Sequence, residues 1–172
     1  MAAMHSAQGT RLKYAFGTHG FGPLLVALLA AACMPEKSRE ASCENTVDTI
    51  LVLSHDDRME QFDRLNLDEK YRWLICSNQF VHPPMLAFTN EFAKLGPTAE
   101  AYLRPKLETA EDDLTVRDIV SVFSFMQALG TYDIANDAEL MHLLESKVAE
   151  MSDPDWKRWG SDELERIRSG EI

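Results

Sequence analysis

Glycine and proline are scarce in this sequence, whose 172 residues include only 8 glycines and 7 prolines. An all-β domain needs many tight turns, which these two residues usually supply, so the composition argues against that fold class. No segment gives a convincing strand pattern. Residues 47–53 are apolar enough for one strand, but no second segment would pair with it.

Motifs that identify common enzyme and metal sites are absent as well. The sequence has no His-Glu-x-x-His pair, paired-cysteine zinc motif, calcium loop, Gly-x-Ser-x-Gly elbow or glycine-rich phosphate loop. His55-Asp56-Asp57 comes nearest to a ligand cluster, but successive side chains on a helix point about 100° apart. We therefore predict no catalytic residue, metal ion or cofactor. A small metal-dependent hydrolase using this cluster is the alternative.

Basic residues are too few to balance the acidic ones: 17 lysines and arginines face 28 aspartates and glutamates, a formal charge of −11. The first 32 residues hold Arg11 and Lys13 and no acid, so removing these two positive charges leaves −13 for the rest. Such a surface repels polyanions, and we predict no nucleic-acid partner. The acids are spread along the chain, as on a solvated surface. A docking face for a basic partner is the second interpretation.

The sequence also lacks an apolar run long enough to span a bilayer, which takes about 20 residues. Its longest run, residues 21–32, has about a dozen, the length of the apolar region of a signal peptide. Arg11 and Lys13 precede this run, and the small residues 30–32 end it, directly before Cys33. This order predicts a signal peptide over residues 1–32.

The stretch Leu29-Ala30-Ala31-Ala32-Cys33 resembles the cleavage and lipidation motif of bacterial lipoproteins, although that family usually has leucine where Ala30 stands. The resemblance implies that Cys33 becomes the new N-terminus and carries a diacylglyceryl thioether, with further acyl chains such as palmitate. Several acyl chains anchor a protein stably to a membrane. Because Met34 replaces the aspartate that often retains such proteins at the inner membrane, a periplasm-facing outer-membrane anchor is expected over an inner-membrane one.

Two other interpretations of the same segment remain open. Ordinary signal-peptidase cleavage after Ala32 would give a secreted protein, and residues 21–32 could instead form a core helix of a cytosolic protein. Met4 is a second possible start, because the segment before the apolar run is long.

Three cysteines are present, and lipidation of Cys33 would leave Cys43 and Cys76 as an even pair. In an oxidising compartment we expect these two to form a disulfide. The bond would close a loop of about 34 residues and stabilise the fold by roughly 3.5–4 kcal/mol. Two unrelated buried thiols are the alternative.

Apolar residues recur at helical spacing through most of the remaining chain, which predicts an all-α fold of five to eight helices. Residues 33–44 are expected to form the lipidated cysteine and a flexible tether, residues 45–169 a single helical domain, and residues 170–172 a frayed tail. Helix starts are predicted at Asn66 or Asp68, after His82-Pro83-Pro84, at Pro97-Thr98, Asp112-Asp113, Asn136 or Asp137, Ser152-Asp153-Pro154 and Ser161-Asp162, with stops at Gly96 and Gly130.

An internal repeat is suggested by Leu95-Gly96 and Leu129-Gly130, which each close an apolar helix 34 positions apart. Between them, Asp112-Asp-Leu-Thr-Val116-Arg117 resembles the opening of the second helix of a HEAT-type repeat, and the resemblance covers residues 105–130. It implies a short array of stacked helical pairs. An irregular helical bundle explains the same pattern.

The most distinctive surface candidate is Trp156-Lys157-Arg158-Trp159 near the C-terminus. Tryptophans three positions apart share one face of a helix, and the two basic residues stand beside them. This cluster could bind a partner protein or lipid headgroups. Alternatively, both rings cover the end of the helical core.

These observations together predict an envelope lipoprotein anchored through Cys33. Its helical domain would be a non-catalytic protein-binding or scaffolding module with a groove between stacked helices as the contact surface. The alternatives are the metal-dependent envelope hydrolase at His55-Asp56-Asp57, and an acidic inhibitor or immunity-type protein that neutralises a basic enzyme.

Overall fold

The computed structural model describes residues 36–170, with side chains from residue 43 onward; residues 1–32 and Cys33 lie outside this range. Every regular element within it is a helix, which confirms the predicted all-α bundle. None of these helices is long and apolar enough to cross a bilayer. In chain order they are α1 (Glu36–Val52), α2 (His55–Arg64), α3 (Leu67–Phe80), α4 (Leu86–Ala93), α5 (Pro97–Glu108), α6 (Asp113–Leu129), α7 (Ala138–Glu150) and α8 (Pro154–Ser169).

Side-chain caps begin several helices where the sequence predicts them. Asp112 is the N-cap of α6, and its carboxylate accepts a hydrogen bond from the backbone nitrogen of Thr115 at 2.8 Å. Asp137, and not Asn136, begins α7 by accepting from the backbone nitrogen of Leu140 at 2.9 Å. Each bond satisfies an amide that has no partner within its own helix, so these aspartates fix where the helices start.

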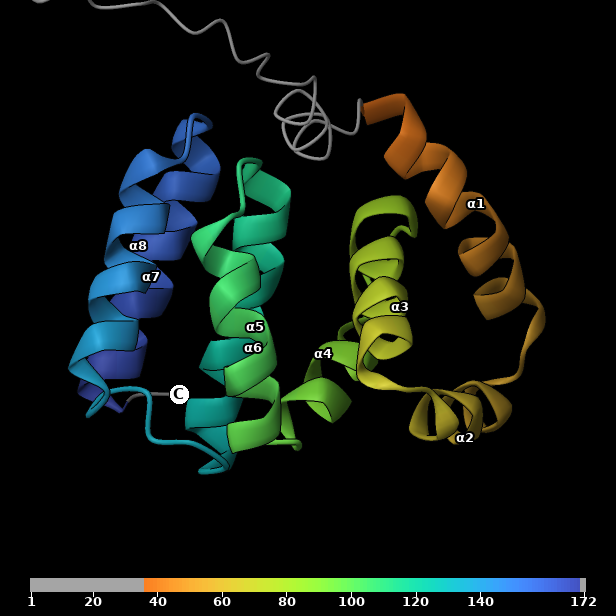
Figure 1. The fold of residues 1–172 in the computed structure, drawn as a ribbon, viewed down its shortest axis with the longest axis horizontal. Coiled ribbons are helices and arrows are strands. Elements are labelled where there is room, and N and C mark those ends of the chain that lie inside the picture. Colours follow the sequence, from red (N-terminus) through yellow and green to blue (C-terminus); the bar gives the residue numbers. More distant parts are fainter. Residues whose placement is uncertain (1–35, 171–172) are drawn as a thin grey trace, which may run out of the picture. The chain divides into compact units, whose positions relative to one another are not determined.

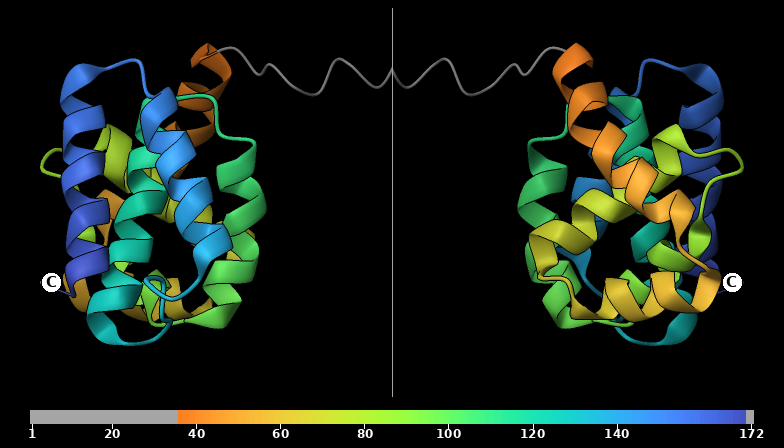
Figure 2. Two further views of the ribbon diagram at one scale, coloured as in Figure 1. Left: turned by 90° about the vertical axis from the view of Figure 1, so that its left-hand side faces the viewer. Right: turned by 90° about the vertical axis from the view of Figure 1, so that its right-hand side faces the viewer.

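Helix α6 lies at the centre of the bundle. It packs against α3, α4, α5, α7 and α8, and the left view of Figure 2 shows it between α5 and α8 with α7 in front. Ile119, Phe123 and Met126 on this helix are fully buried. Burial of each of these side chains stabilises the fold by roughly 2 kcal/mol. The five neighbouring helices are therefore held together through α6 (Figure 1).

Two successive helix pairs, α5–α6 and α7–α8, have the same design. Pro97 and Ala138, which begin α5 and α7, stand 41 positions apart, and the N-caps Asp112 and Asp153 have the same spacing. Equivalent helices lie beside each other, because α5 packs on α7 and α6 packs on α8. The two pairs therefore lie side by side in the second half of the domain.

The structural unit is longer than the spacing of 34 positions between Leu95-Gly96 and Leu129-Gly130. The two glycines have different roles: Gly96 is the N-cap of α5, whereas Gly130 is the C-cap of α6 in the left-handed conformation. Their similar sequence surroundings therefore do not mark equivalent positions in the two pairs.

The C-terminal region is one helix, and the prediction of a second helix starting at Ser161-Asp162 is wrong. Helix α8 continues through Gly160, which is buried against Val148 of α7. The hydroxyl of Ser161 donates to the backbone oxygen of Lys157 at 2.9 Å, so this serine lies within the helix instead of capping a new one.

The first helix also begins earlier than expected. Helix α1 starts at Glu36, inside the segment 33–44 that we expected to be a flexible tether, so the helical domain does not begin at residue 45. The expectation rested on the polar, non-periodic composition of this segment. Composition of this kind does not identify a helix that is held by one neighbour and exposed on its other sides.

We expect Gly96→Ala to lower the free energy of unfolding by roughly 3 kcal/mol or more. The backbone at Gly96 has φ 54° and ψ −126°, which is accessible essentially to glycine alone, and an added Cβ would lie 2.7 Å from the backbone oxygen of Thr131. Urea denaturation followed by circular dichroism measures the change.

Gly130→Ala is the matched control for this substitution. Gly130 also has a positive φ, of 64°, but an added Cβ would meet no atom within 4 Å. The expected loss is only about 1 kcal/mol. Equal losses in the two variants would contradict the close approach of the α4–α5 and α6–α7 turns.

Candidate functional site

The tryptophan pair of α8 packs onto the side of the bundle. The rings of Trp156 and Trp159 meet edge to face with their centroids 6.4 Å apart. Both side chains are half-buried and pack against the hydrophobic core. This arrangement agrees with the interpretation in which the rings cover the core.

The two basic residues between the tryptophans differ in exposure. Lys157 is half-buried, whereas Arg158 is exposed and pairs with Asp155 of the same helix at 2.7 Å. Neither side chain makes a hydrogen bond or ion pair to another helix among residues 43–170. Partner binding by this cluster stays a prediction.

Trp156 covers an arginine of the central helix. The guanidinium of Arg117 lies 4.7 Å from the centroid of the Trp156 ring. The same guanidinium forms an ion pair of 2.6 Å with Asp118 and donates to the backbone oxygen of Asn78 at 3.4 Å. The stacked ring, a carboxylate and a carbonyl thus hold Arg117 between α3, α6 and α8.

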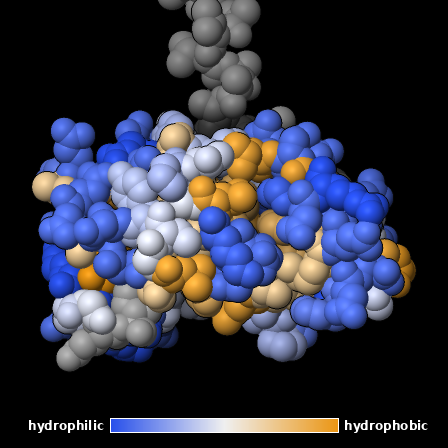
Figure 3. All heavy atoms as spheres, turned by 90° about the horizontal axis from the view of Figure 1, so that it is seen from below, coloured by the Kyte–Doolittle hydropathy of each residue, from blue (hydrophilic) through white to orange (hydrophobic). Residues whose placement is uncertain are grey.

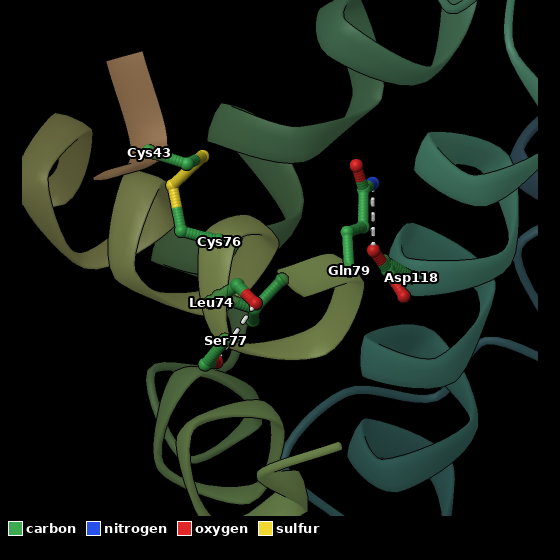
Figure 4. The surroundings of a disulfide bond; sticks show 6 residues. All are labelled: Cys43, Leu74, Cys76, Ser77, Gln79 and Asp118. Atoms are coloured by element: carbon green, nitrogen blue, oxygen red, sulfur yellow. Dashed lines mark hydrogen bonds between the residues drawn. A yellow bond between two sulfur atoms is a disulfide. The ribbon is translucent and has the colours of Figure 1, made fainter. Parts of the chain in front are cut away.

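Asp118 is a charged residue in the middle of the bundle and is only 1% exposed. It accepts hydrogen bonds from Arg117 and from the side-chain amide of Gln79, the latter at 3.0 Å (Figure 4). Burial raises the pKa of Asp118 to about 6, although Arg117 and Gln79 both favour the ionised form. Asp118 is not among the site residues predicted from the sequence, because nothing in a helical pattern shows that an aspartate beside an arginine is buried.

Asn78 and Thr89 extend this buried polar cluster to α4. The side-chain amide of Asn78 donates to the hydroxyl of Thr89 at 3.2 Å, and both residues are buried. The side-chain oxygen of Asn78 is buried and has no partner. Polar contacts therefore connect α3, α4, α6 and α8 at one level of the bundle, where they fix the relative positions of these helices.

An acidic cavity of about 260 Å³ lies where the α5–α6 turn meets the end of α7. Two of its carboxylates have structural partners: Asp112 caps α6, and Asp113 accepts from the backbone nitrogens of Ser152 and Asp153 at 3.0 and 2.7 Å. The hydrogen bond from Asp153 is the main reason that the pKa of Asp113 lies below its ordinary value. The cavity is lined by Ala110, Glu111, Asp112, Asp113, Val116, Lys147, Glu150 and Met151.

A second cavity, of about 510 Å³, lies at the C-terminal ends of α6 and α8. Its wall includes the helix-ending glycines Gly130 and Gly170 and the phenol ring of Tyr132. The hydroxyl of Tyr132 donates to Asp137, the N-cap of α7. Both cavities therefore lie at the ends of the stacked helices and not in a groove along them.

Cys43 and Cys76 form a disulfide between α1 and α3 (Figure 4), with their Cα atoms 5.3 Å apart. This distance lies well inside the range that a disulfide allows. Both cysteines are buried, at 7% and 1% exposure. The structure thus brings together the pair that the cysteine count predicts, while Cys33 lies outside the described residues.

His55, Asp56 and Asp57 form the first turn of α2, and all three are exposed. The carboxylate of Asp57 accepts a hydrogen bond from the hydroxyl of Ser54 at 2.6 Å. Across residues 36–170, no group of three or more histidine, cysteine, aspartate or glutamate residues is arranged to hold a metal ion.

Comparison with known proteins gives no assignment: no family model, no curated protein and no solved structure matches this chain.

Asp118→Asn should change how stability depends on pH. The folded-state pKa of Asp118, about 6, exceeds its ordinary value of 3.8, so between these values the folded chain holds a proton that the unfolded chain has lost. This contribution to stability is present at pH 4 and is lost as the pH rises through 6. As the pH rises from 4 to above 6, the free energy of unfolding of the wild type should therefore fall by roughly 2–3 kcal/mol relative to that of Asp118→Asn.

Parallel urea denaturations of the two proteins at pH 4, 5, 6 and 7 measure this difference. Other titrating groups are common to both proteins and cancel in the comparison. A stability difference that stays constant from pH 4 to pH 7 would show that Asp118 titrates normally, contrary to its burial.

Trp156→Ala should lower the free energy of unfolding by roughly 2–3 kcal/mol, because it removes a half-buried ring and exposes the Arg117 guanidinium that the ring covers. Arg158→Ala is the control from the same turn, and its exposed ion pair should contribute less than about 1 kcal/mol. Thermal denaturation compares the two variants. An unchanged stability of Trp156→Ala would contradict the covering role.

Proposed function

We propose that this chain is an envelope lipoprotein anchored through Cys33, and that its helical domain is a non-catalytic module that binds another protein. The observation that supports its export most directly is the disulfide between Cys43 and Cys76. Disulfides persist in oxidising compartments such as the bacterial periplasm and are rare in the cytosol. Cys43 also lies only ten positions after Cys33, where the segment that resembles a signal peptide and lipidation motif ends.

Surface chemistry supports a binding role for the domain. The formal charge of −13 after residue 32 favours a basic protein over a nucleic acid as partner. Among the residues whose side chains the structure describes, five large apolar side chains are exposed: Leu51, Val52, Phe80, Leu86 and Leu129. On the face drawn in Figure 3, apolar atoms gather toward the middle between hydrophilic margins. An apolar centre with a charged rim is a common arrangement in protein interfaces.

The stacked helix pairs are the third support. Proteins built from HEAT-type repeats bind partners over extended helical surfaces, and the segment around Val116-Arg117 resembles such a repeat. We propose that α5–α8 form a short array of this kind. Its paired caps Asp112 and Asp153 begin the equivalent helices α6 and α8.

The inhibitor or immunity-type interpretation is the second candidate, and the acidic charge favours it. It differs from a scaffold in the partner: an inhibitor would bind one basic enzyme and abolish its activity. Salt-sensitive, stoichiometric inhibition of a captured basic enzyme would select this candidate. Capture without loss of the partner's activity would select the scaffold.

The anchor is tested by intact-mass analysis and fatty-acid labelling of protein from a bacterial membrane fraction. We expect a mature chain that begins at a lipid-bearing Cys33, and loss of the label in Cys33→Ala. Cys76→Ser is the control, because it removes the disulfide and keeps Cys33. A chain that still carries residues 1–32 without lipid would overturn the envelope assignment, and an unlipidated chain beginning at Cys33 would indicate secretion.

A further inference from the structure

Helix α1 packs along α3, but few of its described side chains are buried there. Of residues 43–52, whose side chains the structure describes, only Cys43 and Ile50 are buried. Leu51 and Val52 are 54% and 82% exposed, although they are apolar. The helix packs along α3, and Figure 1 shows it at the edge of the bundle, away from α5–α8.

Polar side chains do not reinforce this attachment. The described polar residues of α1 make one side-chain hydrogen bond, from Thr49 to the backbone oxygen of Asn45 within the same helix. Other helices are joined by such bonds: Arg104 of α5 pairs with Asp137 at the start of α7 at 2.6 Å, and Asp113 of α6 accepts from the backbone preceding α8. For residues 43–52, the disulfide and the burial of Ile50 are therefore the main links to the remainder of the domain.

From this contrast we propose that the Cys43–Cys76 bond is a latch that holds α1 on α3, and that reduction by a protein dithiol releases α1 while α3–α8 stay folded. A thiolate of the dithiol attacks Sγ of Cys43, which as a residue is 7% exposed against 1% for Cys76, and Cys76 leaves as a thiolate. The second thiol then displaces Cys43. The net result is two cysteine thiols on this chain and one disulfide on the dithiol.

Release changes how far the domain can extend from the point where α1 begins. The 17 residues of α1 span roughly 26 Å as a helix and up to roughly 60 Å when extended. An isolated helix of this length is only marginally stable in water, so the freed segment would act as a linker. If the chain is anchored through Cys33, as proposed above, the latch sets the distance from the membrane at which the domain can meet a partner.

Hydrogen exchange with mass spectrometry on the full mature chain tests the latch. In Cys43→Ser/Cys76→Ser, we expect amide protection in α1 to fall by more than about tenfold while protection in α6 is unchanged. In Ile50→Ala with the disulfide intact, α1 should keep its protection. A fall of less than tenfold in α1, or a joint loss of protection in α1 and α6, would overturn the proposal.

The reductive step is tested on the wild type with dithiothreitol, with the oxidation state read by thiol alkylation. We expect alkylation of Cys43 and Cys76 and the same selective loss of protection in α1. A bond that stays closed under conditions in which α6 remains protected would overturn this step. None of these measurements needs the lipid. If Cys33 is not lipidated, the proposed effect on the distance from the membrane is lost. The latch is still tested by the hydrogen-exchange and alkylation results.

Discussion

Helix α6 is covered by five other helices, because its apolar side chains must be kept from water. Its apolar stripe can leave water only if helices cover it on several sides, and α3, α4, α5, α7 and α8 do so. Because Ile119, Phe123 and Met126 are fully buried, each covering helix must offer an apolar face at a matching level. The stacking of the two pairs α5–α6 and α7–α8 follows from this requirement.

A central helix with a charged residue needs that charge to be compensated. Asp118 pairs with Arg117 and accepts a hydrogen bond from Gln79, and the Trp156 ring covers the arginine. With the bond from Asn78 to Thr89, this polar cluster connects α3, α4, α6 and α8. Helix α1 has no comparable connection between residues 43 and 52. It is held by the disulfide to Cys76, by its packing along α3 and by the burial of Ile50.

Much of this architecture could be predicted from the sequence, because local chemistry decides it. Aspartates that cap, such as Asp112, and a glycine that ends a helix, such as Gly130, act through neighbouring backbone groups that a sequence shows directly. The continuity of α8 through Gly160 and the burial of Asp118 could not be predicted. Both depend on residues distant in sequence: Val148 packs on the glycine, and Gln79 donates to the carboxylate. Even the cysteine pairing followed only from counting and from the expected compartment.

We propose that this domain resides in an oxidising compartment, where the Cys43–Cys76 bond joins α1 to α3. Differential alkylation of thiols in intact cells, followed by mass spectrometry of the peptides that contain Cys43 and Cys76, tests it most directly. We expect both cysteines to resist the first alkylating reagent and to react with the second only after reduction. Labelling of both thiols by the first reagent, under conditions that preserve known periplasmic disulfides, would contradict it.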